Sequence, residues 1–168
     1  IGLLNNGRNL PLRYVVSSGN EATVTIEDYL QYFVEDNDIR IILAFVEGFK
    51  NTKKLREVAI NARKARKPII LLKVGTSEVG QKTAQAHTGA LAGSNKVLDA
   101  FFKQSGIIRV NDLDEMLATA TLFEKLAGPL GHNIGVVTIS GGESGMIADV
   151  CADVGLSLSP LSEDTENI

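Results

Sequence analysis

This sequence of 168 residues has no tryptophan, a single cysteine and no long apolar run. Cys151 is the single cysteine, so an internal disulfide is impossible. Chains without a disulfide framework are typical of the reducing cytoplasm, which is the location we expect. No apolar run reaches the ~18–20 residues of a membrane-spanning helix, and no signal peptide is recognisable. A disulfide-stabilised secreted domain and a membrane protein are therefore not expected.

An excess of positive charge is also lacking. Seventeen lysines and arginines face 20 acidic residues, which gives a formal net charge of −3. This balance gives no electrostatic reason to expect binding to nucleic acid. Nine of the basic residues lie between Lys50 and Lys73, mostly on one expected helix, where they favour a solvated face over an anion site. With 44% hydrophobic residues, the composition is that of an ordinary globular protein.

Strand and helix patterns alternate along the chain. Apolar runs predict strands, and stripes with helical spacing, such as Leu113, Met116, Leu117 and Ala120, predict helices between them. The nearly continuous run at residues 39–46 fits a strand covered on both faces. The expected strands are residues 13–18, 39–46, 69–74, 107–110 and 133–139. The alternation predicts an α/β fold with a mostly parallel sheet.

A linker, Gly128-Pro129-Leu130-Gly131, precedes the last expected strand. A second α/β unit is expected to begin after it, with a helix that turns Met146, Ile147, Val150, Cys151 and Val154 inward. The chain opens on Ile1 rather than methionine, and we expect it to be a piece of a larger protein.

Three features follow expected strands, at the ends where α/β sheets form their sites. Glu47 ends a buried strand, His87 lies among small residues in the loop after the next strand, and a glycine-rich turn at residues 140–145 opens a helix. A neutral imidazole can attack phosphorus, a carboxylate can fix its tautomer, and a glycine-rich helix start favours an anion. Together they suggest a histidine that carries a phosphoryl group.

Each feature also has a plain structural interpretation. A single loop histidine is often incidental, as we expect for His132, and Glu47 can simply face solvent. The turn contains neither the Gly-Lys-Ser/Thr of a P-loop nor Gly-x-Gly-x-x-Gly, and Glu143 within it opposes an anion. Taken separately, the three features leave these alternatives open.

The stretch Ala86-His87-Thr88-Gly89-Ala90-Leu91-Ala92-Gly93-Ser94 closely resembles the NDP-forming acyl-CoA synthetases, relatives of succinyl-CoA synthetase. The resemblance extends to Ser17-Ser18-Gly19-Asn20-Glu21-Ala22 and Gly106-Ile107-Ile108-Arg109-Val110. It implies that His87 is phosphorylated during catalysis and that Glu47 orients it. It also implies that Gly141, Gly142, Glu143, Ser144 and Gly145 form a phosphate-binding helix start.

The same resemblance implies a domain organisation and a set of co-substrates. Residues 1–127 correspond to a first flavodoxin-like ligase domain that lacks its N-terminal strand, with a three-layer parallel sheet. Residues 128–168 correspond to a linker and the start of a second such domain. CoA, ATP or ADP, and Mg²⁺ are expected to bind mainly to CoA-binding and ATP-grasp domains on the same or a partner chain. An oligomer is expected.

The implied activity is an acid–thiol ligase that converts a carboxylic acid, CoA and NTP to acyl-CoA, NDP and phosphate through an acyl phosphate and a phosphohistidine. The fragment alone is expected to be inactive. One rival is a non-catalytic acyl-CoA- or nucleotide-sensing domain of a protein acetyltransferase relative. Another is a flavodoxin-like phosphorelay or interaction domain.

Overall fold

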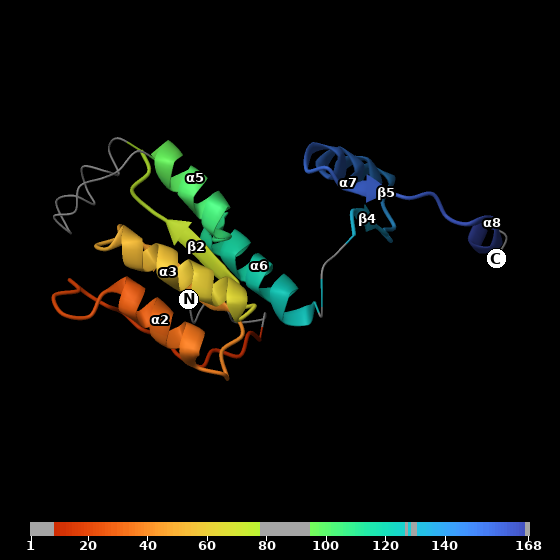
Figure 1. The fold of residues 1–168 in the computed structure, drawn as a ribbon. Coiled ribbons are helices and arrows are strands. Elements are labelled where there is room, and N and C mark those ends of the chain that lie inside the picture. Colours follow the sequence, from red (N-terminus) through yellow and green to blue (C-terminus); the bar gives the residue numbers. More distant parts are fainter. Residues whose placement is uncertain (1–8, 78–94, 127, 129–130, 167–168) are drawn as a thin grey trace. The chain divides into compact units, whose positions relative to one another are not determined.

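The computed structural model describes residues 9–77, 95–126, 128 and 131–166. The contacts divide the chain into two units, Ile1–Leu126 and Ala127–Ile168. Both units consist of strands and helices in alternation (Figure 1).

The first unit is built on a parallel three-stranded sheet in the order β1-β2-β3. In the register, Ile42 of β1 lies beside Ile69 of β2, and Ile70 of β2 lies beside Ile108 of β3. The strands are β1 (Ile42–Val46), β2 (Ile69–Lys73) and β3 (Ile108–Val110). The helices are α2 (Ile26–Glu35), α3 (Thr52–Lys64), α5 (Asn95–Ser105) and α6 (Leu113–Lys125).

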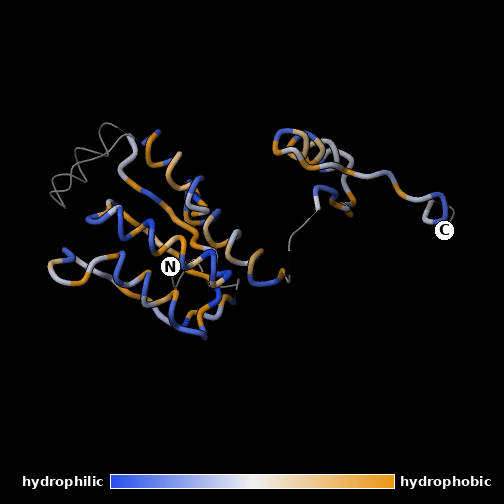
Figure 2. The backbone as a smooth tube through the Cα atoms, in the orientation of Figure 1, coloured by the Kyte–Doolittle hydropathy of each residue, from blue (hydrophilic) through white to orange (hydrophobic). Residues whose placement is uncertain are grey.

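Helices cover both faces of this sheet, which makes three layers. On one face, side chains of α2, α3 and α5, among them Leu30, Leu55 and Phe102, form the larger hydrophobic core. On the other face, Met116 and Ala120 of α6 pack against β2 and β3. Strand β2 runs between these layers as a hydrophobic segment (Figure 2). The expected α/β fold with a parallel sheet is confirmed.

Local sequence signals explain where the helices begin and end. The side chains of Asn51 and Asp112 accept backbone N–H bonds from Lys54 and Glu115 and so cap α3 and α6, as residues of these types commonly do. Gly106 closes α5 with φ +74°, a left-handed conformation that glycine adopts without strain. A Cβ at this position would lie 3.0 Å from the Arg63 side chain.

Strand β1 departs from the expectation of a strand buried on both faces. Ile42, Ala44 and Val46 are buried, whereas Phe45 on the opposite face is 50% exposed. The reason is the position of α6, which contacts β2 and β3. Leu43, on the same face as Phe45, is only partly buried at the margin of the core that contains Met116 and Ala120.

Residues 13–18 do not form the expected strand. Val15 and Val16 are exposed, and β1 pairs only with β2 within the described part of the chain. Tyr14, Val15 and Val16 are residues that favour an extended backbone, but a strand also requires a partner for its backbone hydrogen bonds.

The second unit contains β4 (Asn133–Ile134), α7 (Gly141–Asp153), β5 (Ser157–Leu158) and α8 (Glu163–Glu166). Strands β4 and β5 are parallel, and α7 connects them. The strand expected at residues 133–139 is shorter, with Val137 and Ile139 fully exposed. The expected inward face is wrong for Met146 and Val150 of α7 and for Val154 after its end, which are exposed. It is correct for Cys151, which is buried, and in part for Ile147, which is partly buried. The described residues of this unit are too few to cover that face.

The capping of α2 leads to a prediction about acid stability. The Lys54 ammonium and the N–H and hydroxyl of Thr25 donate to the Asp28 carboxylate and lower its pKa from 3.8 to about 2. A carboxylate with a lowered pKa contributes stability that is complete above pH 3.8 and is lost as the pH falls towards 2. We expect Asp28→Asn to remove this part of the pH dependence and to lower stability at neutral pH, as measured by thermal unfolding from pH 2 to pH 7.

The control is Asp38→Asn, which removes an exposed carboxylate paired with Arg13. An Asp28→Asn protein whose unfolding curve follows that of the wild type through the acid range would contradict the assigned role of the Asp28 carboxylate.

Candidate functional site

The carboxyl ends of the three parallel strands lie at one edge of the sheet, where sites of α/β folds commonly form. Glu47 follows β1 directly at this edge, and its side chain is exposed. The backbone N–H of Val74 donates to the carbonyl of Val46 over 3.0 Å, which continues the pairing of the two strands to their ends. Glu47 is therefore beside the segment that leaves β2.

His87 lies outside the described residues. The chain that contains it joins the end of β2 to the start of α5. Its two described ends are bonded to each other, because the side-chain amide of Asn95 donates to the carbonyl of Thr76. Both ends of the segment are thus near the carboxyl end of β2, and the contact between His87 and Glu47 stays a prediction.

Two cationic side chains, Lys73 and Arg109, line the same end of the sheet. The partly buried Lys73 ammonium has a pKa below its usual value, because burial and then the Arg109 charge disfavour the cation, whereas Glu47 acts in the opposite direction. Arg109 forms an ion pair with Asp99 of α5, and its Nε is buried with no hydrogen-bond partner in the described structure. The edge therefore carries Glu47, Lys73, Arg109 and Asp99 as charges of both signs.

A hollow of about 540 Å³ opens beside Arg109. Asp99 and Lys103 of α5 and Asn111 after β3 line it together with Phe102 and Ile107. The Arg109 guanidinium that faces this hollow is already paired with Asp99, and Lys103 is the other cation that lines it.

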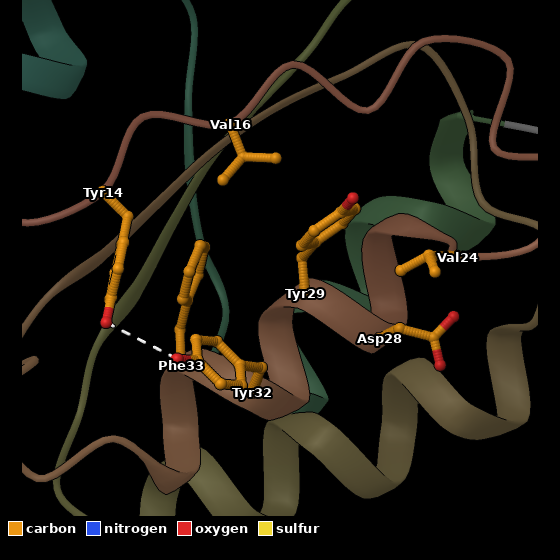
Figure 3. Close-up of a pocket in the computed structure, with 7 residues that line it drawn as sticks. All are labelled: Tyr14, Val16, Val24, Asp28, Tyr29, Tyr32 and Phe33. Atoms are coloured by element: carbon orange, nitrogen blue, oxygen red, sulfur yellow. Dashed lines mark hydrogen bonds between the residues drawn. The ribbon is translucent and has the colours of Figure 1, made fainter.

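A second hollow, of about 320 Å³, lies against α2 (Figure 3). Val24, Tyr29, Tyr32 and Phe33 line it together with Tyr14 and Val16 of the preceding segment. Tyr14 stacks on Phe33 with ring centroids 5.7 Å apart. The carboxylate that lines this hollow, Asp28, already binds Lys54 and Thr25, so this apolar hollow offers no free carboxylate.

The glycine-rich turn belongs to the second unit and forms the first residues of α7. Ser140 is the N-cap, and its hydroxyl oxygen accepts the N–H of Glu143 over 3.4 Å. The Glu143 carboxylate accepts a hydrogen bond from the Thr138 hydroxyl. Gly141, Gly142, Ser144 and Gly145 are exposed. A carboxylate at this helix start opposes an anion, and phosphate binding here stays a prediction.

Sequence reasoning missed three charged residues of the first unit. Glu27 is fully buried, but an acid in the first turn of a helix suggests only a favourable interaction with the helix dipole. Lys73 ends and Arg109 interrupts an apolar strand, and a charge in such a strand is the signal in the sequence that points to them. In the described residues there is no group of three or more histidine, cysteine or acidic side chains able to hold a metal, and no helix long and apolar enough to cross a membrane.

Residues 3–123 match the model of a family described as succinyl-CoA ligase like flavodoxin domain. The chain belongs to this family. The match covers the sheet of the first unit, the helices on both of its faces and the segment that contains His87. The suspected relationship to NDP-forming acyl-CoA synthetases is confirmed at the level of the family.

Two curated relatives carry the name ADP-forming acetate–CoA ligase. The protein from Methanocaldococcus jannaschii is 39% identical over 94% of this chain and 22% of its own length. The subunit alpha of the type I protein from Pyrococcus furiosus is 42% identical over 88% of this chain and 32% of its own length. The chain therefore spans between about a fifth and a third of the relatives that it matches.

A solved structure supports the fold. It is the dinucleotide-forming acetyl-coenzyme A synthetase 1 of Ca. Korarchaeum cryptofilum in complex with phosphate and ADP. This neighbour is 33% identical, covers 88% of the present chain and 32% of its own, and superimposes with a TM-score of 0.76.

Proposed function

We propose that this chain is the phosphoryl-carrying part of an acid–thiol ligase. The parent protein converts a carboxylic acid, CoA and NTP to acyl-CoA, NDP and phosphate. The observation that supports this most strongly is the family match, which spans the sheet edge with Glu47 and the segment with His87. The relatives named as ADP-forming ligases support the choice of ADP and ATP as the nucleotide pair.

In the nucleotide-dependent half-reaction, a neutral ring nitrogen of His87 attacks the terminal phosphorus of NTP. A P–N bond forms, the P–O bond to NDP breaks, and the proton on the other ring nitrogen stays there. Glu47 accepts a hydrogen bond from that N–H and balances the positive charge that the ring gains. Its position at the end of β1, beside the segment that leaves β2, supports this role.

In the other half-reaction, the phosphoryl group passes from His87 to the carboxylic acid, and CoA then displaces phosphate from the acyl phosphate. The start of α7, residues 141–145, is proposed to receive the phosphorylated histidine. The exposure of these residues at the start of a helix and the positive end of its dipole support this assignment.

CoA, and the nucleotide with its Mg²⁺, are proposed to bind mainly to domains outside this chain. A CoA-binding domain and an ATP-grasp domain, in the same chain or in a partner of an oligomer, would supply these sites. CoA and adenine nucleotides are cytoplasmic pools, which suits a cytoplasmic enzyme.

The test uses the full-length parent with γ-labelled ATP and magnesium. We expect an acid-labile, base-stable phosphoryl group on His87 that is discharged by a carboxylic acid together with CoA. A protein that binds acyl-CoA but stays unlabelled would favour the sensing domain instead. Labelling that requires a separate kinase and ignores CoA would favour a phosphorelay.

A further inference from the structure

Glu27 is a buried acid with an unusual set of contacts. Its side chain is fully buried within α2, where a carboxylate is rare unless it is paired or hydrogen-bonded. One oxygen, Oε1, accepts the backbone N–H groups of both Lys50 and Asn51 over 2.9 Å. The other oxygen, Oε2, has no hydrogen-bond partner in the described structure. Both hydrogen bonds of the Glu27 carboxylate in the described structure therefore go to one short segment of backbone.

That piece of backbone is the turn between β1 and α3, residues 47–51, which begins with Glu47. Asn51 is the N-cap of α3, so the Glu27 carboxylate lies at the positive end of this helix, where a negative charge is favourable. Phe49 in the middle of the turn packs into the larger core with its ring centroid 6.0 Å from that of Phe102. Only Gly48 and Phe49 separate Glu47 from Lys50, which supplies the first N–H that Glu27 binds.

Lys50 connects the same turn to a third segment. Its ammonium donates to the carbonyls of Asn20 over 2.7 Å and Glu21 over 2.6 Å. Residues 19–21 form a tight bend in which Gly19 and Glu21 have positive φ. The turn that carries Glu47 is thus fixed by the core below it, by Glu27 on α2 and by the bend at residues 19–21.

We propose that Glu27 is a positioning residue for Glu47, and that its Oε1 holds the turn at residues 47–51 in the geometry from which Glu47 orients His87. The inference rests on the proposed function, because Glu27 would affect catalysis only through the reaction of His87. The property of Glu27 that this role requires is a hydrogen-bond acceptor on a side chain long enough to reach the backbone N–H groups of Lys50 and Asn51. The negative charge contributes less, since one oxygen accepts both bonds and the other accepts none.

Three variants of the full-length parent separate these properties. Glu27→Gln keeps an acceptor at full reach without the charge, Glu27→Asp keeps the charge on a shorter side chain, and Glu27→Leu removes both. We expect the rate of His87 phosphorylation by labelled ATP to fall about 10- to 100-fold in Glu27→Asp and Glu27→Leu, because a displacement of about 1 Å in a reacting group has effects of this size. Glu27→Gln is expected to stay within about threefold of the wild type, and the KM for ATP to stay unchanged in all three.

The matched control is Glu35→Leu, which changes an exposed acid on the same helix and should leave the rate unchanged. Combination with Glu47→Ala, which leaves no side chain able to bond the imidazole, distinguishes positioning from a general loss of stability. If Glu27 acts through Glu47, Glu27→Asp should slow the Glu47→Ala protein by less than about twofold. Hydrogen exchange of the peptide that spans residues 47–51 should increase in Glu27→Asp and not in Glu27→Gln.

The outcomes distinguish failure of this inference from failure of the proposed function. A wild-type parent that is never labelled on His87 overturns both. If the wild type is labelled on His87 and Glu27→Asp and Glu27→Leu are labelled at the wild-type rate, only the role of Glu27 is overturned. Slow labelling of Glu27→Gln with normal labelling of Glu27→Asp would also overturn it, because the charge would then be the property that matters. If Glu27→Leu does not fold, Glu27→Asp and Glu27→Gln still decide.

Discussion

Replacement of His87 by alanine in the full-length parent is expected to abolish formation of the acyl-CoA thioester. Under the proposed mechanism the phosphoryl group must be carried by His87 between the nucleotide and the carboxylic acid, and an alanine has no nitrogen to carry it. We expect the rate of ATP-dependent thioester formation to fall by at least about a thousandfold, as is usual when a covalent nucleophile is removed. The measurement is a coupled assay of ADP and acyl-CoA production.

The half-reactions show whether such a loss has the proposed cause. In His87→Ala, labelling of the protein by γ-labelled ATP should disappear, whereas binding of CoA should match the wild type. His132→Ala is the matched control, since His132 is the other histidine of the chain and should keep full activity. A His87→Ala protein with normal turnover would eliminate the phosphohistidine mechanism and with it our assignment of Glu47.

The fold of the first unit could be predicted where burial and local signals agree. Strand β2 is buried on both faces, and its unbroken run of isoleucine and leucine already indicates this. Asp112, with Glu115 three residues later, indicates the start of α6, and the Asp112 side chain accepts the Glu115 N–H over 2.7 Å. In each case the residues that produce the pattern are the residues that make the contact.

The prediction failed where the outcome depends on partners far along the chain. Residues 13–18 have the composition of a strand, yet pairing requires a second strand, and none in the described part of the chain accepts them. Phe45 belongs to an apolar run but is half exposed, because α6 packs over β2 and β3 rather than β1. A sequence pattern indicates which residues can be buried, whereas the topology decides which are.

The exposed apolar residues of the second unit bear on the proposed domain organisation. Val137, Ile139 and Met146 have the spacing of inward-facing residues but are exposed. Surfaces of this kind usually pack against a further element. They support the proposal that residues 128–168 begin a second flavodoxin-like domain whose remaining strands and helices would cover them.

For the candidate site, the sequence predicts roles for His87 and Glu47, which stay predictions, and gives no indication of Glu27, which binds the turn that begins with Glu47. Glu47 attracts attention because it ends a run of apolar residues. Glu27 has no such signal, since its role comes from two backbone N–H groups 23 and 24 residues away. Hydrogen bonds to the backbone depend on the path of the chain. Every residue except proline has a backbone N–H, so the residue types that donate to Glu27 do not reveal these bonds.

Substitution of Glu47 by glutamine is expected to slow phosphorylation of His87 without preventing the binding of CoA. A glutamine can still accept a hydrogen bond from the imidazole, but it is neutral and cannot balance the positive charge that the ring gains when phosphorus bonds to its other nitrogen. We expect a fall of about 10- to 100-fold, the range found when a hydrogen-bond partner of a metal-ligating histidine is lost. The measurement is the single-turnover rate of labelling by γ-labelled ATP.

The charge of Glu47 also acts on Lys73, whose ammonium it favours, so the loss of a negative charge at this edge needs its own control. Glu57→Gln removes an exposed carboxylate from α3 in the same unit and should leave the labelling rate unchanged. The equilibrium amount of phosphorylated protein should fall in Glu47→Gln as well. The ring carries a positive charge only in the phosphorylated state, so the Glu47 carboxylate stabilises that state more than the unphosphorylated one. Labelling of Glu47→Gln with the rate and extent of the wild type would remove Glu47 from the site and leave the His87 tautomer to be set by another group.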